Sequence, residues 1–92
     1  MGDSDRFKNV ELLLKNDRAV EARQAFLQLD TENSVEYFLI RGKIEQKFQN
    51  WGDAINAFNK VLEIDPENTE ARNNLQLIQN ILNFWNPDMF NP

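Results

Sequence analysis

The sequence that decides the fold is QNWGDAINAFNKVLEIDPEN, residues 49–68, because it repeats an earlier stretch, KNDRAVEARQAFLQLDTEN, residues 15–33. Both stretches begin near an asparagine, Asn16 or Asn50, and continue into an alanine-bearing amphipathic run. Both then end in a leucine-rich turn and the pattern Asp-x-Glu-Asn. The chain therefore repeats with a period of roughly 34 residues, which is typical of stacked helical units.

Helical spacing of apolar residues extends outward from the second copy. Before it, apolar residues recur at helical spacing and no proline interrupts them, so they predict a helix whose apolar stripe is Val35, Phe38, Leu39, Ile44 and Phe48. A second helix is expected from Asp53 to Ile64, with Asn50 as its N-cap and Pro66 just beyond its end. Its apolar face consists of Ala54, Ile55, Ala57, Phe58, Val61, Leu62 and Ile64. The short link between these two helices requires them to run antiparallel, as a hairpin.

Three further helices complete the prediction. After Asn68, which offers a cap, a helix from Thr69 to about Asn83 carries one apolar face. That face consists of Ala71, Leu75, Ile78 and Leu82. Before the first copy, one helix face is formed by Phe7, Val10, Leu13 and Leu14, and its partner's face by Ala19, Ala22, Phe26 and Leu29. The fold class is therefore all-α, with five helices.

The composition narrows the class of protein. Ninety-two residues form one domain, and 41% hydrophobic with 27% charged residues is the composition of a folded globular chain. The net charge of −5 opposes phosphate binding, so a nucleic-acid partner is not expected. The sequence has no run long enough for a membrane span and no apolar signal-peptide core, so the expected location is cytoplasmic without membrane attachment.

The second copy resembles the tetratricopeptide repeat family. Phe38-x2-Arg41-Gly42-x2-Glu45, then Ala54-x3-Phe58 and Pro66, lies in register with the family pattern Trp-x2-Leu-Gly-x2-Tyr, Ala-x3-Phe, Pro. The sequence departs from the pattern at Phe38, Arg41 and Glu45, and keeps it at Gly42, Ala54, Phe58 and Pro66. Gly42 and Ala54 are expected to let the two helices approach, with Phe58 filling the space beyond them.

The resemblance implies antiparallel hairpins stacked as a short right-handed solenoid. Residues 1–33 would form a degenerate first repeat, in which Ala19 fits the pattern but Arg23 takes the Phe place and Thr31 the Pro place. Residues 34–67 would form the clear repeat, residues 68–85 a terminal capping helix, and residues 86–92 an aromatic and proline-bearing tail. The repeats number about two and a half.

The resemblance also implies a concave groove that binds extended peptides or partner segments. By the family pattern, the groove would be lined by Asn9, Leu12, Glu36, Leu39, Lys43, Gln46, Asn73 and Leu77. Some members of the family clamp a partner's C-terminal carboxylate with Lys and Asn. Here Asp5 and Leu39 occupy the places where basic residues are wanted, so an apolar or mixed contact through Leu39 and Leu77 is favoured over such a clamp. Each of these side chains can also be read as ordinary solvated helix surface.

Catalytic and metal-binding patterns are not found in the sequence. The chain has no Cys and no His, and no nucleophile is paired with a base, so an enzyme, a metal and a cofactor are not expected. Asp65-Pro66-Glu67-Asn68 lacks the glycine and the distant bidentate Glu of a calcium loop, and it is interpreted as a turn between repeats. Trp51 is expected to pack into the core beneath the hairpin link.

The last twelve residues, ILNFWNPDMFNP, differ from the rest of the chain. Pro87 should end the last helix between Asn83 and Trp85. Phe84 and Trp85 extend an ordered helix and are expected to cap the core. Docking Met89 and Phe90 gains roughly 1.5–3 kcal/mol per side chain. It must also order about five residues at about 1–2 kcal/mol each. The two terms nearly cancel, so these side chains could contact their own domain, a second copy or a foreign protein.

Two functions follow as hypotheses. The first is a non-enzymatic interaction module that binds a partner protein or peptide in its groove. The second is a self-capped or self-associating structural domain whose tail residues Phe84, Trp85, Met89 and Phe90 fill an apolar surface of the same chain or of a neighbour, which would make it a homo-oligomer in the latter case. A concentration-dependent mass would separate the two.

Overall fold

Helices make up most of the chain that the structure describes. The computed structural model describes residues 5–85, and within that range it contains five helices. They are α1 (Asp5–Lys15), α2 (Ala19–Leu27), α3 (Val35–Lys47), α4 (Trp51–Ile64) and α5 (Thr69–Trp85). The predicted all-α class and the five helices are confirmed. No helix in residues 5–85 is long and apolar enough to cross a membrane.

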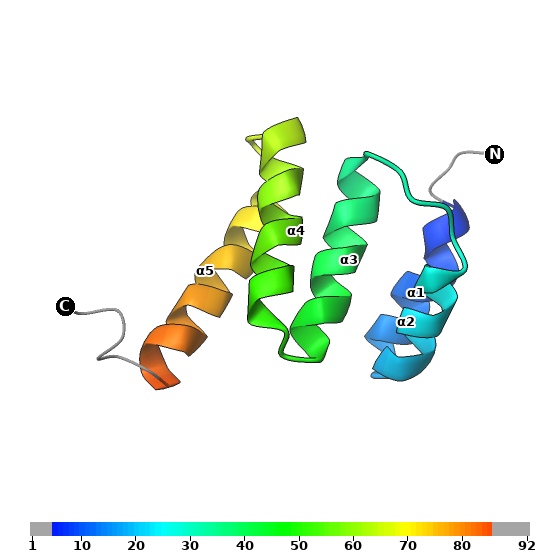
Figure 1. Cartoon of the computed structure of the whole chain (residues 1–92), viewed down its shortest axis with the longest axis horizontal. Helices are drawn as coiled ribbons and strands as arrows, with labels where there is room; N and C mark the ends of the chain where they lie inside the picture. The colour runs from blue at the N-terminus through cyan, green and yellow to red at the C-terminus, as the bar shows by residue number, and fades with distance from the viewer. Residues whose placement is uncertain (1–4, 86–92) are drawn as a thin grey trace.

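The helices pack mainly against their neighbours in the sequence. α1 and α2 form one antiparallel hairpin, and α3 and α4 form a second one (Figure 1). α3 also packs against α1 and α2, so it joins the hairpins, and α5 packs on α4. Figure 1 shows the result as a row, with the first hairpin at one end and α5 at the other.

The core consists of two clusters of buried side chains. The cluster around the first hairpin and α3 comprises Phe7, Val10, Leu14, Ala22, Phe26, Tyr37, Ile40 and Ile44. The cluster around α4 and α5 comprises Ala54, Phe58, Val61, Ala71 and Ile78. These clusters confirm the apolar faces predicted for α1, α4 and α5. Trp51 packs against the second cluster, as expected.

The apolar stripe predicted for α3 was incomplete. The sequence pattern included Val35, Phe38 and Leu39, which are only half-buried, and it omitted Tyr37 and Ile40, which are buried. The reason is that α3 is covered on two sides, by the first hairpin and by α4. A helix that is covered on two sides buries residues outside any single stripe.

Gly42 lies where α3 and α4 approach most tightly. A Cβ atom at this position would stand 2.6 Å from Cε1 of Phe58, which is far inside van der Waals contact. Phe58 and Ala54 are both fully buried. The expected roles of these three residues in the α3–α4 hairpin are confirmed.

The two hairpins turn with the same local structure, 32 positions apart along the chain. Asp17 and Gln49 have positive φ values of 59° and 60°. The next residue in each case closes the turn: Arg18 N–H donates to the Leu13 carbonyl at 2.8 Å, and Asn50 N–H donates to the Glu45 carbonyl at 2.9 Å. Both are Schellman-type helix ends, here built without glycine.

The same spacing corrects the interpretation of the first copy. Ala22 and Phe26 are buried, and they lie 32 positions before Ala54 and Phe58. Ala22-x3-Phe26 is therefore the counterpart of Ala54-x3-Phe58, whereas the sequence alignment had assigned Ala19 and Arg23. That alignment was wrong because it matched the two Asp-x-Glu-Asn ends, although α2 has 9 residues and α4 has 14.

Side chains cap the N-termini of α3 and α5. Tyr37 N–H donates to Ser34 Oγ at 3.2 Å, and Ala71 N–H donates to Asn68 Oδ1 at 2.9 Å. Asn50 occupies the N-cap position of α4, but its side chain makes no capping bond. Its side-chain amide donates instead to Glu45 Oε1 at 2.9 Å. The expected position of Asn50 was therefore right, but the expected capping hydrogen bond is not formed.

Ser34 also joins α3 to α1 through a short polar chain. Its hydroxyl donates to Glu32 at 2.6 Å, and Glu32 forms an ion pair with Arg6 at 3.3 Å. We expect Ser34→Ala to lower the free energy of unfolding by about 1 kcal/mol, the usual loss for an N-cap. Urea denaturation measures this, with Thr31→Ala in the exposed loop as the control that should stay within about 0.5 kcal/mol. Equal effects of the two substitutions would contradict a capping role.

Candidate binding groove

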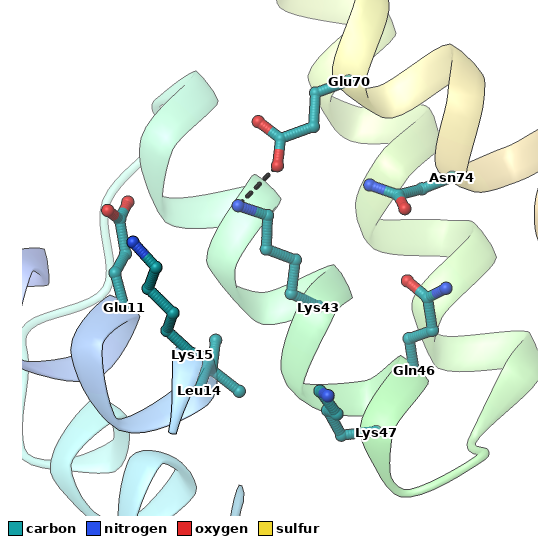
Figure 2. Close-up of a pocket in the computed structure, with 8 residues that line it drawn as sticks. All are labelled: Glu11, Leu14, Lys15, Lys43, Gln46, Lys47, Glu70 and Asn74. Carbon is teal, nitrogen blue, oxygen red and sulfur yellow. Dashed lines mark ion pairs between the residues drawn. The ribbon is translucent and has the colours of Figure 1, made fainter. Parts of the chain in front are cut away.

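A groove of about 530 Å³ is lined by side chains from α1, α3 and α5. Its lining residues come from these three helices: Glu11, Leu14 and Lys15 from α1, Lys43, Gln46 and Lys47 from α3, and Glu70 and Asn74 from α5. Figure 2 shows their side chains grouped around the end of Lys43, with those from α1 on one side and those from α5 on the other. We refer to it as the inner groove.

The 32-residue spacing of the hairpins explains which side chains line the inner groove. Glu11 and Lys43 occupy equivalent places on α1 and α3, and so do Leu14 and Gln46. Lys15 and Lys47 form the third such pair. Equivalent positions on α1 and α3 face the same groove, so the lining continues from the first hairpin to the second.

Ion pairs fix part of the lining. Lys43 Nζ pairs with Glu70, which ties α3 to α5 across the groove (Figure 2). Lys47 Nζ pairs with Asp17 at 3.2 Å, which ties α3 to the turn of the first hairpin. These side chains are partly exposed, so each pair contributes little to stability, of the order of 0–1 kcal/mol. Their main effect is to orient the ammonium groups.

The inner groove differs in charge from the rest of the chain. Its three lysines outnumber its two glutamates, although the whole chain carries −5, and Asp17 outside the lining offsets the charge of Lys47. Lys15 forms no ion pair with any of the residues that the structure describes. Its ammonium group can therefore bind a ligand carboxylate without losing a partner.

The remaining lining residues suit a peptide. The amides of Gln46 and Asn74 each carry both donors and an acceptor, so they can bind either group of a peptide backbone. Leu14 is buried and supplies an apolar floor. The groove can thus hold a polar extended segment, and its lining contains no hydroxyl or thiol nucleophile.

The structure brings together two of the eight side chains expected in a groove. Lys43 and Gln46 line the inner groove. Glu36 lies exposed near the start of α3, and Leu39 is half-buried against the second core cluster. Neither of these two lines the inner groove.

The expected residues of α1 and α5 lie outside the lining. Asn9 is exposed on α1, and Leu12 is 57% exposed, on the side that faces away from the buried residues of that helix. On α5, Asn73 is exposed and adjacent to the lining residue Asn74, while Leu77 is 47% exposed one turn further on. The positions on α1 miss the groove by two residues, because they lie 34 residues before Lys43 and Gln46, whereas the turns and the buried Ala-x3-Phe pairs of the two hairpins are 32 residues apart.

Sequence reasoning missed six lining residues. They are Glu11, Leu14, Lys15, Lys47, Glu70 and Asn74. For those on α1, matching Ala22-x3-Phe26 to Ala54-x3-Phe58 would have given the correct spacing. For Glu70 and Asn74 the sequence offers no such signal, because the packing of α5 on α4 decides which of its side chains face the groove.

The predicted tail contacts fall largely outside the described residues. Phe84 is 79% exposed, so the expectation that it caps the core was wrong. The reason is its place on α5, since Phe84 follows the inward-facing Leu82 by two residues and points to the opposite side of the helix. The side chain of Trp85, and all of Met89 and Phe90, lie outside the described residues.

Comparison with known proteins leaves the chain without a family assignment. No protein-family model, no curated protein and no solved structure matches it. The residues and their geometry must therefore carry any statement about function.

Proposed function

We propose that this chain is a non-enzymatic protein-interaction module of the tetratricopeptide type, with about two and a half repeats in a right-handed stack. It binds an extended segment of a partner protein in the inner groove between α1, α3 and α5. The observation that carries the proposal is the groove itself, because three successive first helices contribute to one continuous lining of lysines and amides.

Three features of the fold support the repeat assignment. The two hairpins share their turn structure and their buried Ala-x3-Phe at a spacing of 32 residues. The capping residues Ser34 and Asn68 repeat at a spacing of 34. Gly42 brings α3 against Phe58 as the family pattern requires. A chain with these spacings stacks helix pairs in one direction and leaves the first helices on one side.

The charge and hydrogen-bonding groups of the inner groove indicate the ligand. Lysine ammonium groups attract carboxylates, and the flanking amides of Gln46 and Asn74 can bind a peptide backbone. We therefore propose that the partner segment is extended and acidic. Its carboxylates would meet Lys15 first, since Lys43 and Lys47 already have carboxylate partners.

Selection of random peptides displayed on phage against the full chain tests this proposal. We expect enrichment of Asp and Glu in the selected peptides. Lys15→Ala should weaken the binding of a selected synthetic peptide about tenfold, the effect of losing an interaction worth about 1.4 kcal/mol. Isothermal titration calorimetry measures the affinity, and higher salt should lower it further.

The matched control is Lys60→Ala on α4. It removes the same charge from an exposed lysine that does not line the inner groove. Both variants should melt like the parent chain, because neither lysine is buried. If the two variants weaken the peptide equally, binding depends on net charge alone and the inner groove is not the site.

A further inference from the structure

A second groove lies along α4 and α5 and is mainly apolar. It measures about 320 Å³ and is lined by Ile55 from α4 and by Leu75, Gln79 and Leu82 from α5. The three apolar side chains are half-buried against the second core cluster. We refer to it as the end groove, because it lies on the last helix of the row in Figure 1.

The end groove is the place where the next helix of a stack would pack. α3 is covered by the first hairpin on one side and by α4 on the other, whereas α5 packs principally on α4 within residues 5–85. Leu75 and Leu82 therefore complete the second cluster only in part, and the described residues leave their outer side uncovered. Covering these apolar side chains with another apolar group would remove them from water and so stabilise the folded chain.

We propose that residues 86–92 of this chain fold back into the end groove and cover it with Met89 and Phe90. The proposal concerns a different surface from the inner groove and does not depend on peptide binding there. Residues 86–92 are long enough to reach the end groove, and they are covalently linked to α5, which lines it.

The reach of the segment matches the groove. The lining residue Gln79 lies six residues before the end of α5 at Trp85, which corresponds to about 9 Å along a helix axis. Proline disfavours continuation of a helix, so we place the start of the proposed return at Pro87. An extended chain advances about 3.3 Å per residue, so Met89 and Phe90, two and three residues after Pro87, can return about 7–10 Å, which takes them to the level of Leu82 and Gln79.

The tether favours the same chain over a second copy. A segment joined by a few residues to its binding site has an effective concentration of the order of millimolar. A second copy would have to reach a similar concentration to compete for the same groove. At micromolar protein the chain's own segment therefore occupies the end groove.

Engineered disulfides test the proposal directly, because the chain contains no cysteine. The test variant combines Gln79→Cys with Met89→Cys in the full chain. A disulfide forms readily only where the two Cβ atoms come within about 3.5–4.5 Å. We expect fast oxidation at micromolar concentration to a monomer that holds an internal disulfide, read by mass spectrometry and non-reducing electrophoresis.

The matched control combines Asn80→Cys with Met89→Cys. Asn80 is exposed like Gln79 but points about 100° further around α5, away from the end groove. We expect the internal disulfide to form at least tenfold faster in the Gln79 variant. Equal rates in the two variants would show that the segment does not dock and would overturn the proposal. Disulfide-linked dimers as the main product of the Gln79 variant would overturn it as well, in favour of docking onto a second copy.

Discussion

Replacing Gly42 by valine is expected to lower the free energy of unfolding by about 3 kcal/mol, the upper part of the usual range for overpacked cores. A Cβ at this position would already stand 2.6 Å from the Phe58 ring, and valine adds two further methyl groups. The ring is fully buried among Ala54, Val61 and Ile78, so it has no open space into which it can move. Urea denaturation followed by tryptophan fluorescence should show a midpoint lower by about 2 M.

Gly52 provides the control for this prediction. It also lies in a helix, but a Cβ there would meet nothing within 4 Å. Gly52→Val should therefore change the free energy of unfolding by no more than about 0.5 kcal/mol. Adding Phe58→Leu should offset part of the damage in Gly42→Val, so that the double variant is more stable than the sum of the single effects predicts. Additive effects would show that the glycine is needed for some reason other than contact with Phe58.

Helix positions and most core residues could be predicted from the sequence because they depend on local information. The spacing of apolar residues is set by the helix itself, so α1, α4 and α5 revealed their buried faces before their partners were known. The contact between Gly42 and Phe58 was also predictable, because the family pattern encodes it. α3 was the exception, since Tyr37 and Ile40 are buried by helices that lie far away in the sequence.

The relation between the two hairpins was harder to predict because two sequence signals disagree. The Asp-x-Glu-Asn motifs align the ends of the copies, and the Ala-x3-Phe motifs align their helices. Only the second alignment agrees with the fold. Buried side chains of equivalent helices must occupy equivalent places in the core, whereas the loops that follow the helices can differ in length. α2 ends early, at Leu27, and this accounts for the different spacings of the two motifs.

The inner groove depends on that same relation. A shift of two residues on a helix turns a side chain by about 200°, so Asn9 and Leu12 were placed on the wrong side of α1 relative to this groove. The lining from α5 depends additionally on the packing of α5 against α4, which no local pattern encodes. In this chain the helices could therefore be predicted from the sequence more readily than the side chains that line the inner groove.

Phe26→Ala is expected to lower the free energy of unfolding by about 3–5 kcal/mol, whereas Arg23→Ala should cost no more than about 1 kcal/mol. Phe26 is 6% exposed, and its ring lies 4.9 Å from that of Tyr37, so its removal leaves a cavity between α2 and α3. Arg23 is exposed, and its guanidinium group lies 5.0 Å from the centre of the Phe48 ring. The comparison decides which of the two residues corresponds to Phe58.

Thermal and urea denaturation of these two variants and of Phe58→Ala gives the decisive set. If the hairpins are equivalent at a spacing of 32 residues, Phe26→Ala and Phe58→Ala should produce losses of similar size, because both remove a buried ring from an Ala-x3-Phe pair. A large loss for Arg23→Ala with a small one for Phe26→Ala would instead restore the sequence alignment based on Ala19. Since the 32-residue spacing also places Glu11 and Lys15 in the inner groove, that result would remove the structural basis for their role there.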